Sequence, residues 1–78
     1  MILRTIGSGS SGNCYLLIDA ENNVLILDAG MPVDRVKVAL DFNIRAIKGV
    51  FVSHEHADHA QYLKDFRLLG CEIFTPYI

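Results

Sequence analysis

The sequence predicts a single small α/β or α+β domain built on a mixed sheet, with its helices on one side. Two apolar runs near the N-terminus flank a short polar segment, which indicates a β-hairpin. Later in the chain, short apolar runs alternate with amphipathic segments, which is typical of strands interleaved with helices. The 78 residues are 51% hydrophobic and 21% charged, so we expect a buried core and one domain spanning 1–78.

The first half of the chain is predicted to be β-rich. A short strand over Leu3–Ile6 is followed by the glycine- and serine-rich stretch 7–13, GSGSSGN, which is predicted to be a tight loop. The apolar runs Cys14–Asp19 and Val24–Asp28 lie on either side of AENN at 20–23. They form a hairpin with a polar turn.

The second half is predicted to contain two helices and two strands. Apolar residues at helical spacing indicate a helix from Pro32 to about Phe42 and a second helix over Asp58–Leu69, with Gly70 as its C-terminal cap. Between them, Gly49–Ser53 is short, β-branched and almost wholly apolar, as expected for a strand covered on both faces. Cys71–Thr75 gives a last short strand.

Composition excludes several classes of protein. The formal net charge of −2 argues against a broad nucleic-acid-wrapping surface. There is no apolar run of the roughly 20 residues needed to span a membrane, and the N-terminus lacks a signal-peptide stretch. We therefore expect a cytoplasmic protein with no membrane partner. Cys14 and Cys71 are interpreted as small buried thiols, because two cysteines so far apart make neither a disulfide framework nor a metal-ligand pair.

The stretch VSHEHADH at 52–59 contains all three histidines of the chain. His54 and His56 are two apart, so in extended backbone both imidazoles project to the same side and can share one metal ion. Asp58 and His59 follow where the second helix begins, close enough to hold a second ion. Imidazole and carboxylate suit zinc, with iron and manganese as alternatives. A two-metal site activates a bridging water, so the chemistry indicated is hydrolysis.

Two stretches carry a family resemblance. SHEHADH at 53–59 resembles the HxHxDH signature of the metallo-β-lactamase-fold metallohydrolases, and SGSSGNCYLL at 8–17 is similar to the opening of a bacterial exonuclease-like or phosphodiesterase-like subgroup. The resemblance implies a dinuclear zinc enzyme. It also implies that this chain is the N-terminal half of the family's four-layer αββα sandwich.

The resemblance also implies roles for particular residues. His54 and His56 would bind the first metal, and Asp58 and His59 the second, which makes Asp58 the catalytic carboxylate. Asp28, at the end of its strand, would lie behind the site and orient a ligand by hydrogen bonding. The alternative for Asp28 is an ordinary turn residue at a strand end.

The early loop is a candidate substrate-binding element. In the subgroup this loop borders the active site, so its residues could contact a substrate or an anion through backbone amides and side chains. The alternative is simple turn chemistry. The candidates are Ser8, Ser10, Ser11 and Asn13.

The chain departs from the family in its ligand count. Members complete the site with a later histidine, a bridging aspartate and a final histidine, whereas no histidine lies outside 54–59 here. Each metal would have two protein ligands where a catalytic zinc usually has three. We therefore expect 1–78 to be an N-terminal fragment that is inactive alone. We also expect it to self-associate or to pair with a missing C-terminal half.

The leading functional prediction is the N-terminal segment of a metal-dependent hydrolase acting on phosphodiester bonds, with nucleic acid as a substrate class. Two alternatives remain open. One is a hydrolase of another ester, thioester or lactam, because such enzymes share the motif. The other is a non-catalytic metal-binding or assembly module.

Overall fold

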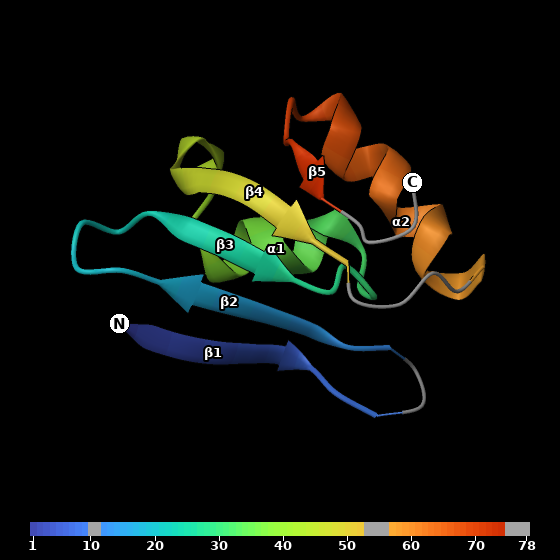
Figure 1. Cartoon of the computed structure of the whole chain (residues 1–78), viewed down its shortest axis with the longest axis horizontal. Helices are drawn as coiled ribbons and strands as arrows, with labels where there is room; N and C mark the ends of the chain where they lie inside the picture. Colours follow the sequence, from blue (N-terminus) through green and yellow to red (C-terminus); the bar gives the residue numbers. More distant parts are fainter. Residues whose placement is uncertain (10–11, 53–56, 75–78) are drawn as a thin grey trace.

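The computed structural model describes residues 1–9, 12–52 and 57–74. These residues form a five-stranded sheet with two α-helices and one short 3₁₀ helix (Figure 1). In chain order the elements are β1 (Ile2–Gly7), β2 (Cys14–Ile18), β3 (Val24–Leu27), α1 (Val33–Ala39), η1 (Ile44–Ala46), β4 (Ile47–Phe51), α2 (Ala57–Leu68) and β5 (Ile73–Phe74).

The strands lie in the order β1-β2-β3-β4-β5. The pairs β1–β2 and β2–β3 are antiparallel, while β3–β4 and β4–β5 are parallel. The helix α1 connects β3 to β4, and α2 connects β4 to β5, as parallel neighbours require. This arrangement confirms the predicted mixed sheet and agrees with part of a metallo-β-lactamase fold.

One face of the sheet carries the core. Alternate strand residues point to this face, and both helices pack on it, since α1 supplies Val33 and Val36 and α2 supplies the fully buried Phe66. In Figure 1, α1 is seen behind the sheet. The buried strand residues on this face are Cys14, Leu16, Val24, Ile26 and Val50.

The expectation that the fourth strand is covered on both faces is wrong for the described part of the chain. Val50 is fully buried, but its neighbour Phe51 points to the other face and is 41% exposed. The apolar run reflects a strand whose second face is apolar without being covered by a described helix.

The predicted hairpin between β2 and β3 is confirmed, and its turn has a clear local cause. The carboxylate of Asp19 accepts hydrogen bonds from the backbone amides of Glu21 and Asn23, both at 2.9 Å, and from the side-chain amide of Asn23 at 3.0 Å. Asn22 takes a left-handed conformation with φ 64°, which asparagine tolerates better than most residues. These contacts lower the pKa of Asp19, the Asn23 side chain contributing most.

The first helix is shorter than the predicted span. It ends at Ala39 because Asp41 and Phe42 adopt left-handed φ angles of 52° and 63°. Their amides donate to the carbonyl oxygens of Val38 and Lys37 at 3.1 and 2.7 Å, which closes the last turn in the Schellman manner. Non-glycine residues seldom adopt such φ angles. Because neither Asp41 nor Phe42 is a glycine, the sequence does not mark the end of this helix.

The second helix ends as predicted. Gly70 has φ 85° and donates to the carbonyl oxygen of Arg67 at 2.9 Å, while the amide of Cys71 donates to that of Phe66 at 3.2 Å. This is the same capping motif with the expected glycine. None of the described helices is both long and apolar enough to cross a bilayer.

Strand boundaries differ by a few residues from the predictions. The fourth strand begins at Ile47, directly after the unpredicted 3₁₀ turn η1, and ends at Phe51. The fifth strand is limited to Ile73–Phe74, and Thr75 lies outside the described residues. Both cysteines are free, Cys14 buried and Cys71 half-buried.

Candidate metal-binding edge of the sheet

One edge of the sheet collects the segments that the sequence singles out. The ends of β3, β4 and β5 lie there because the three strands are parallel, and the start of β2 lies there because β2 is antiparallel to β3. The row Tyr15–Leu27–Phe51–Phe74 crosses the sheet at this level. The amide of Asp28 donates to the carbonyl oxygen of Phe51 at 2.7 Å, which ties the end of β3 to the end of β4.

The HxHxDH segment connects β4 to α2 at this edge. On its N-terminal side, Val52 is buried and its amide donates to the carbonyl oxygen of Phe74 at 2.9 Å. On its C-terminal side, α2 begins at Ala57 and is anchored on the core by Phe66. Both flanks of the segment are therefore fixed at the edge where α/β folds commonly bind ligands.

The predicted ligands themselves are only partly placed. His54 and His56 lie outside the described residues. Asp58 and His59 fall in the first turn of α2, and their side chains are outside the described part. Elsewhere in the described residues, no three His, Cys, Asp or Glu side chains come close enough to hold a metal ion. Convergence of the four side chains stays a prediction.

The donor chemistry fits a metal. The three imidazoles and the Asp58 carboxylate, all within six consecutive positions, are ligand types that zinc prefers.

Asp28 follows the last residue of β3, at the strand end where the sequence places it. Its role behind a metal site stays a prediction. Asp28 has φ 60°, a left-handed conformation for which aspartate is enriched among non-glycine residues, and this conformation turns the chain out of β3. The pKa of the Cys14 thiol is raised to about 11, first by burial and then by the Asp28 carboxylate, while Arg35 opposes the shift. Asp28 therefore lies close to the start of β2.

The glycine- and serine-rich loop is at the same edge, and its polar residues differ in role. The side-chain oxygen of Asn13 accepts from the amide of Gly9 at 3.0 Å, and the amide of Gly12 donates to the carbonyl oxygen of Gly9 at 3.2 Å. Asn13 thus uses its oxygen to hold the loop, which favours the turn interpretation for this residue. Ser8 is exposed, whereas Ser10 and Ser11 lie outside the described residues.

A contact between two glycines, not foreseen from the sequence, locks this loop against the strand end. The amide of Gly30 donates to the carbonyl oxygen of Asn13 at 2.8 Å. A Cβ on Gly12 would overlap the carbonyl oxygen of Gly30, and one on Gly30 would lie 2.7 Å from both the backbone nitrogen and the backbone oxygen of Asn13. The signal in the sequence is a glycine one residue before the end of the loop, in SGN, and another shortly after β3, in DAG.

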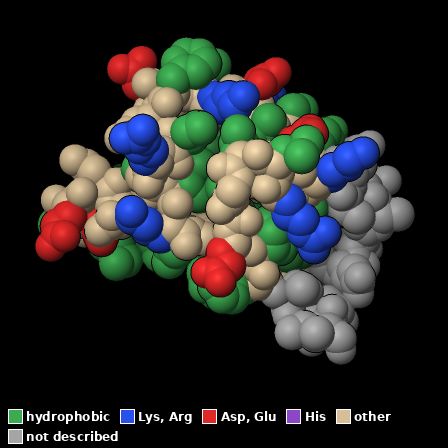
Figure 2. All heavy atoms as spheres, turned by 90° about the horizontal axis from the view of Figure 1, so that it is seen from above, with side chains coloured by type: hydrophobic (Ala, Val, Ile, Leu, Met, Phe, Trp, Pro, Cys, Tyr) green, Lys and Arg blue, Asp and Glu red, His purple; other side chains and the backbone are tan. Residues whose placement is uncertain are grey.

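Arg35 lies on α1, and no motif in the sequence singles it out. Its guanidinium donates to the carbonyl oxygen of Ile6 at 3.2 Å, next to the loop, and its positive charge reaches the Cys14 thiol. The surface seen in Figure 2 carries Lys and Arg as well as Asp and Glu side chains, interspersed with apolar ones. In that view, neither positive nor negative side chains dominate the surface.

Comparison with known proteins agrees with this geometry. The family model described as the metallo-beta-lactamase superfamily matches residues 7–68, so the chain belongs to this superfamily, whose members generally bind metal ions, usually zinc. A curated relative named exodeoxyribonuclease YycJ, from Bacillus anthracis, is 33% identical over 61 residues. The match covers 74% of this chain and 23% of the relative, so the chain spans about a quarter of that protein's length.

Proposed function

We propose that residues 1–78 form the metal-binding part of a metal-dependent hydrolase that cleaves phosphodiester bonds, with nucleic acid as the substrate class. The observation that carries this proposal is the meeting of three segments at one sheet edge: the 7–13 loop, the turn at Asp28, and both flanks of the HxHxDH segment. Membership of the superfamily supports hydrolysis. The name of the relative, an exodeoxyribonuclease, supports the choice of phosphodiesters.

In this proposal His54 and His56 hold one ion, and Asp58 and His59 hold a second. When bound, two zinc ions supply an activated water near neutral pH and polarise a phosphoryl oxygen. Manganese or iron would serve the same ligands. Asp58 is the catalytic residue of the chain in the sense that its carboxylate contacts the ion.

The remaining residues of the edge position the reactants. Asp28 would accept an N–H from a ligating imidazole, which fixes the ring's tautomer and orientation. The hydroxyl of exposed Ser8 would donate to a phosphate oxygen. Asn13 and the two glycines hold the 7–13 loop in place.

The metal-binding step is tested by titrating Mn²⁺ into isotopically labelled protein and following amide signals by NMR. A paramagnetic ion broadens nearby amides steeply with distance, so Asp28, Gly30 and Val52 should broaden first. The hairpin turn at 20–23 lies at the other end of β3, roughly 15 Å away for a strand of this length, and serves as an internal control. Equal broadening at both ends would contradict the proposed location.

Site residues are tested with a matched pair of variants on α2. Asp58→Asn should weaken Mn²⁺ binding several-fold, because a neutral amide is a poorer ligand than a carboxylate. Asp65→Asn makes the same carboxylate-to-amide change at an exposed residue of the same helix. It should leave the affinity for Mn²⁺ unchanged. Equal affinities for both variants would exclude Asp58 as a ligand.

Substrate class is tested in the metal-loaded state with a thymidine dinucleotide and, separately, with an acyl thioester. The dinucleotide should shift the amides of Ser8, Gly9 and Gly12, and the thioester should not. Shifts caused by the thioester alone would replace the phosphodiester assignment with the alternative substrate class.

Turnover by this chain alone is expected to be absent. The 78 residues offer two protein ligands per ion, which predicts weak zinc binding that weakens further as pH falls and the imidazoles protonate. The assay is hydrolysis of bis(p-nitrophenyl) phosphate with added zinc or manganese. Activity that disappears in His56→Ala would show that the site is complete within 1–78.

A further inference from the structure

The loop at 7–13 begins at a β-bulge in the first strand. Thr5 and Gly7 of β1 pair with Tyr15 and Cys14, which are adjacent on β2, so the register shifts by one residue between the two pairs. Ile6 is therefore an extra residue on β1. A bulge bends its strand and changes the direction in which the chain leaves the sheet, and bulges of this kind are common next to active sites.

Arg35, in the first turn of α1, contacts this bulge. Its guanidinium donates to the carbonyl oxygen of Ile6 at 3.2 Å. Arginine suits such a contact because its planar group presents several N–H donors at the end of a long side chain. The hydrogen bond joins the point where β1 enters the loop to the helix that follows β3.

The other contacts of the loop lead to the same part of the chain. At the end of the loop, the amide of Gly30 donates to the carbonyl oxygen of Asn13 at 2.8 Å. At its start, a Cβ on Gly7 would overlap the terminal methyl group of Met31, which is 8% exposed. The stretch 30–35 therefore contacts the loop at both of its ends.

Electrostatic effects place the same groups close together. The pKa of the Cys14 thiol is raised first by burial and then by the Asp28 carboxylate, while the Arg35 guanidinium lowers it. Both charges therefore act at the start of β2, where the loop ends. Asp28 and Arg35 are also the first and last residues of one continuous stretch, 28–35. This stretch runs from the candidate metal-binding edge to the bulge.

We infer that Arg35 is a positioning residue for the 7–13 loop. By holding the carbonyl oxygen of Ile6, it sets the direction in which the loop leaves β1, and with it the place of Ser8 at the candidate metal-binding edge. Arg35 acts through the backbone of Ile6 and is not itself a ligand or a catalytic residue. The effect on the loop stands on the contacts above, whereas the effect on substrate binding rests on the proposed function.

This role predicts that metal binding and substrate binding respond differently to the loss of Arg35. In the proposed function the 54–59 segment holds the ions, and Ser8 on the loop contacts the phosphodiester. A change that moves only the loop should therefore weaken binding of the phosphodiester and leave the affinity for the metal as it is.

Arg4 offers a matched control. Its guanidinium donates to the carbonyl oxygen of Ala39 at 3.1 Å, so it also joins β1 to α1 through a single backbone carbonyl. Both arginines are exposed. The Arg4 contact lies at the last residue of α1, whereas the Arg35 contact lies beside the loop. Replacing either arginine removes one positive charge and one contact between the same strand and helix.

The first experiment follows amide hydrogen exchange by NMR in the metal-free 78-residue chain. Arg35→Met keeps an apolar stem but has no donor, so the amides of Gly9 and Gly12, which are hydrogen-bonded within the loop, should exchange roughly three- to tenfold faster. Arg35→Lys can still donate to Ile6 and should restore most of the protection. Arg4→Met should leave both amides unchanged.

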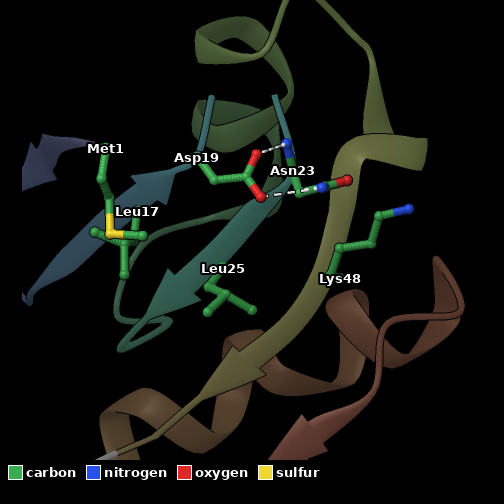
Figure 3. Close-up of a pocket in the computed structure, with 6 residues that line it drawn as sticks. All are labelled: Met1, Leu17, Asp19, Asn23, Leu25 and Lys48. Atoms are coloured by element: carbon green, nitrogen blue, oxygen red, sulfur yellow. Dashed lines mark hydrogen bonds between the residues drawn. The ribbon is translucent and has the colours of Figure 1, made fainter. Parts of the chain in front are cut away.

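The hairpin turn provides an internal reference within each sample. The amide of Asn23 donates to the Asp19 carboxylate at 2.9 Å (Figure 3), and this turn lies at the opposite end of β2 from the loop. Exchange at Asn23 should be the same in all variants. Circular dichroism confirms that each variant is folded.

The second experiment titrates a thymidine dinucleotide into the chain with zinc in excess and follows the amide of Ser8. Arg35→Met should lower the affinity for the dinucleotide several-fold and leave the affinity for zinc at the wild-type value. Arg35→Lys should recover most of the affinity for the dinucleotide. Arg4→Met should bind both as the wild type does.

The two experiments separate this inference from the proposed function. A wild-type chain that binds zinc but not the dinucleotide would contradict the proposed function, and the exchange rates alone would then decide the role of Arg35. Unchanged exchange at Gly9 and Gly12 in Arg35→Met would overturn the positioning role. If the affinity for the dinucleotide fell nonetheless, Arg35 would contact the substrate directly. Equal changes in Arg35→Met and Arg4→Met would also overturn the inference.

Discussion

Replacing Phe66 with alanine tests how the second helix is held on the sheet. Phe66 is the largest fully buried side chain of the described residues and the main anchor of α2. Truncating a buried phenylalanine typically costs about 3–5 kcal/mol, which combines lost burial with the cavity left behind. A domain of this size has a free energy of unfolding of roughly 4–12 kcal/mol, so Phe66→Ala removes a large share of it.

The control is Phe42→Ala, because Phe42 is 67% exposed at the end of α1. Burying about a third of a phenylalanine contributes roughly 0.5–1 kcal/mol, and alanine at this position has the same left-handed φ to adopt. Since each kcal/mol shifts the melting temperature of a small domain by about 4–8 °C, Phe66→Ala should lower it by roughly 12–40 °C. Phe42→Ala should lower it by less than about 10 °C.

The measurement is thermal and urea unfolding followed by circular dichroism, at one fixed protein concentration. Phe66→Leu keeps most of the volume and should cost about 1–1.5 kcal/mol, so it gives a folded variant if Phe66→Ala does not fold. Equal losses in Phe66→Ala and Phe42→Ala would refute the view that α2 is fixed through Phe66, and with it the argument that the C-terminal flank of the HxHxDH segment is held at the sheet edge.

Three further predictions concern local features. Gly30→Ala should cost about 1–3 kcal/mol and shift the amides of the 7–13 loop, because its Cβ would lie 2.7 Å from the Asn13 backbone; Gly70→Ala, with open space around it, should leave those amides unchanged. The pKa of Cys14 is raised to about 11 from 9.0, so the free energy of unfolding should fall as pH rises from about 9 to 11, and Cys14→Val should remove that slope. Asn23→Ala should raise the pKa of Asp19 toward its ordinary value, since the Asn23 side chain is the main cause of its lowering; an unchanged NMR titration of Asp19 would contradict the hydrogen-bond assignment.

Most of the fold could be predicted because its signals are local. The polar turn between two apolar runs fixed the hairpin, and Gly70 marked the end of α2. The end of α1 could not be predicted, because Asp41 and Phe42 adopt left-handed φ angles and neither residue type indicates such a conformation. The 3₁₀ turn η1 has no periodicity to detect over its three residues.

The sequence indicates where the candidate site lies better than it indicates which backbone contacts hold the site together. The family resemblance implies that Asp28 and the 7–13 loop lie near the site, and the strand pairing places the end of β3 and the start of β2 at one edge of the sheet. The Gly12–Gly30 contact depends on how two loops approach in space, which sequence spacing does not determine.

The strand patterns explain why the sheet has a second apolar face. A strand with one solvated face alternates apolar and polar residues, yet β2 and β3 are apolar at consecutive positions. Selection for the core face alone would not require Leu17, Leu25 and Leu27, because all three point away from it. These leucines therefore reflect a second contact surface.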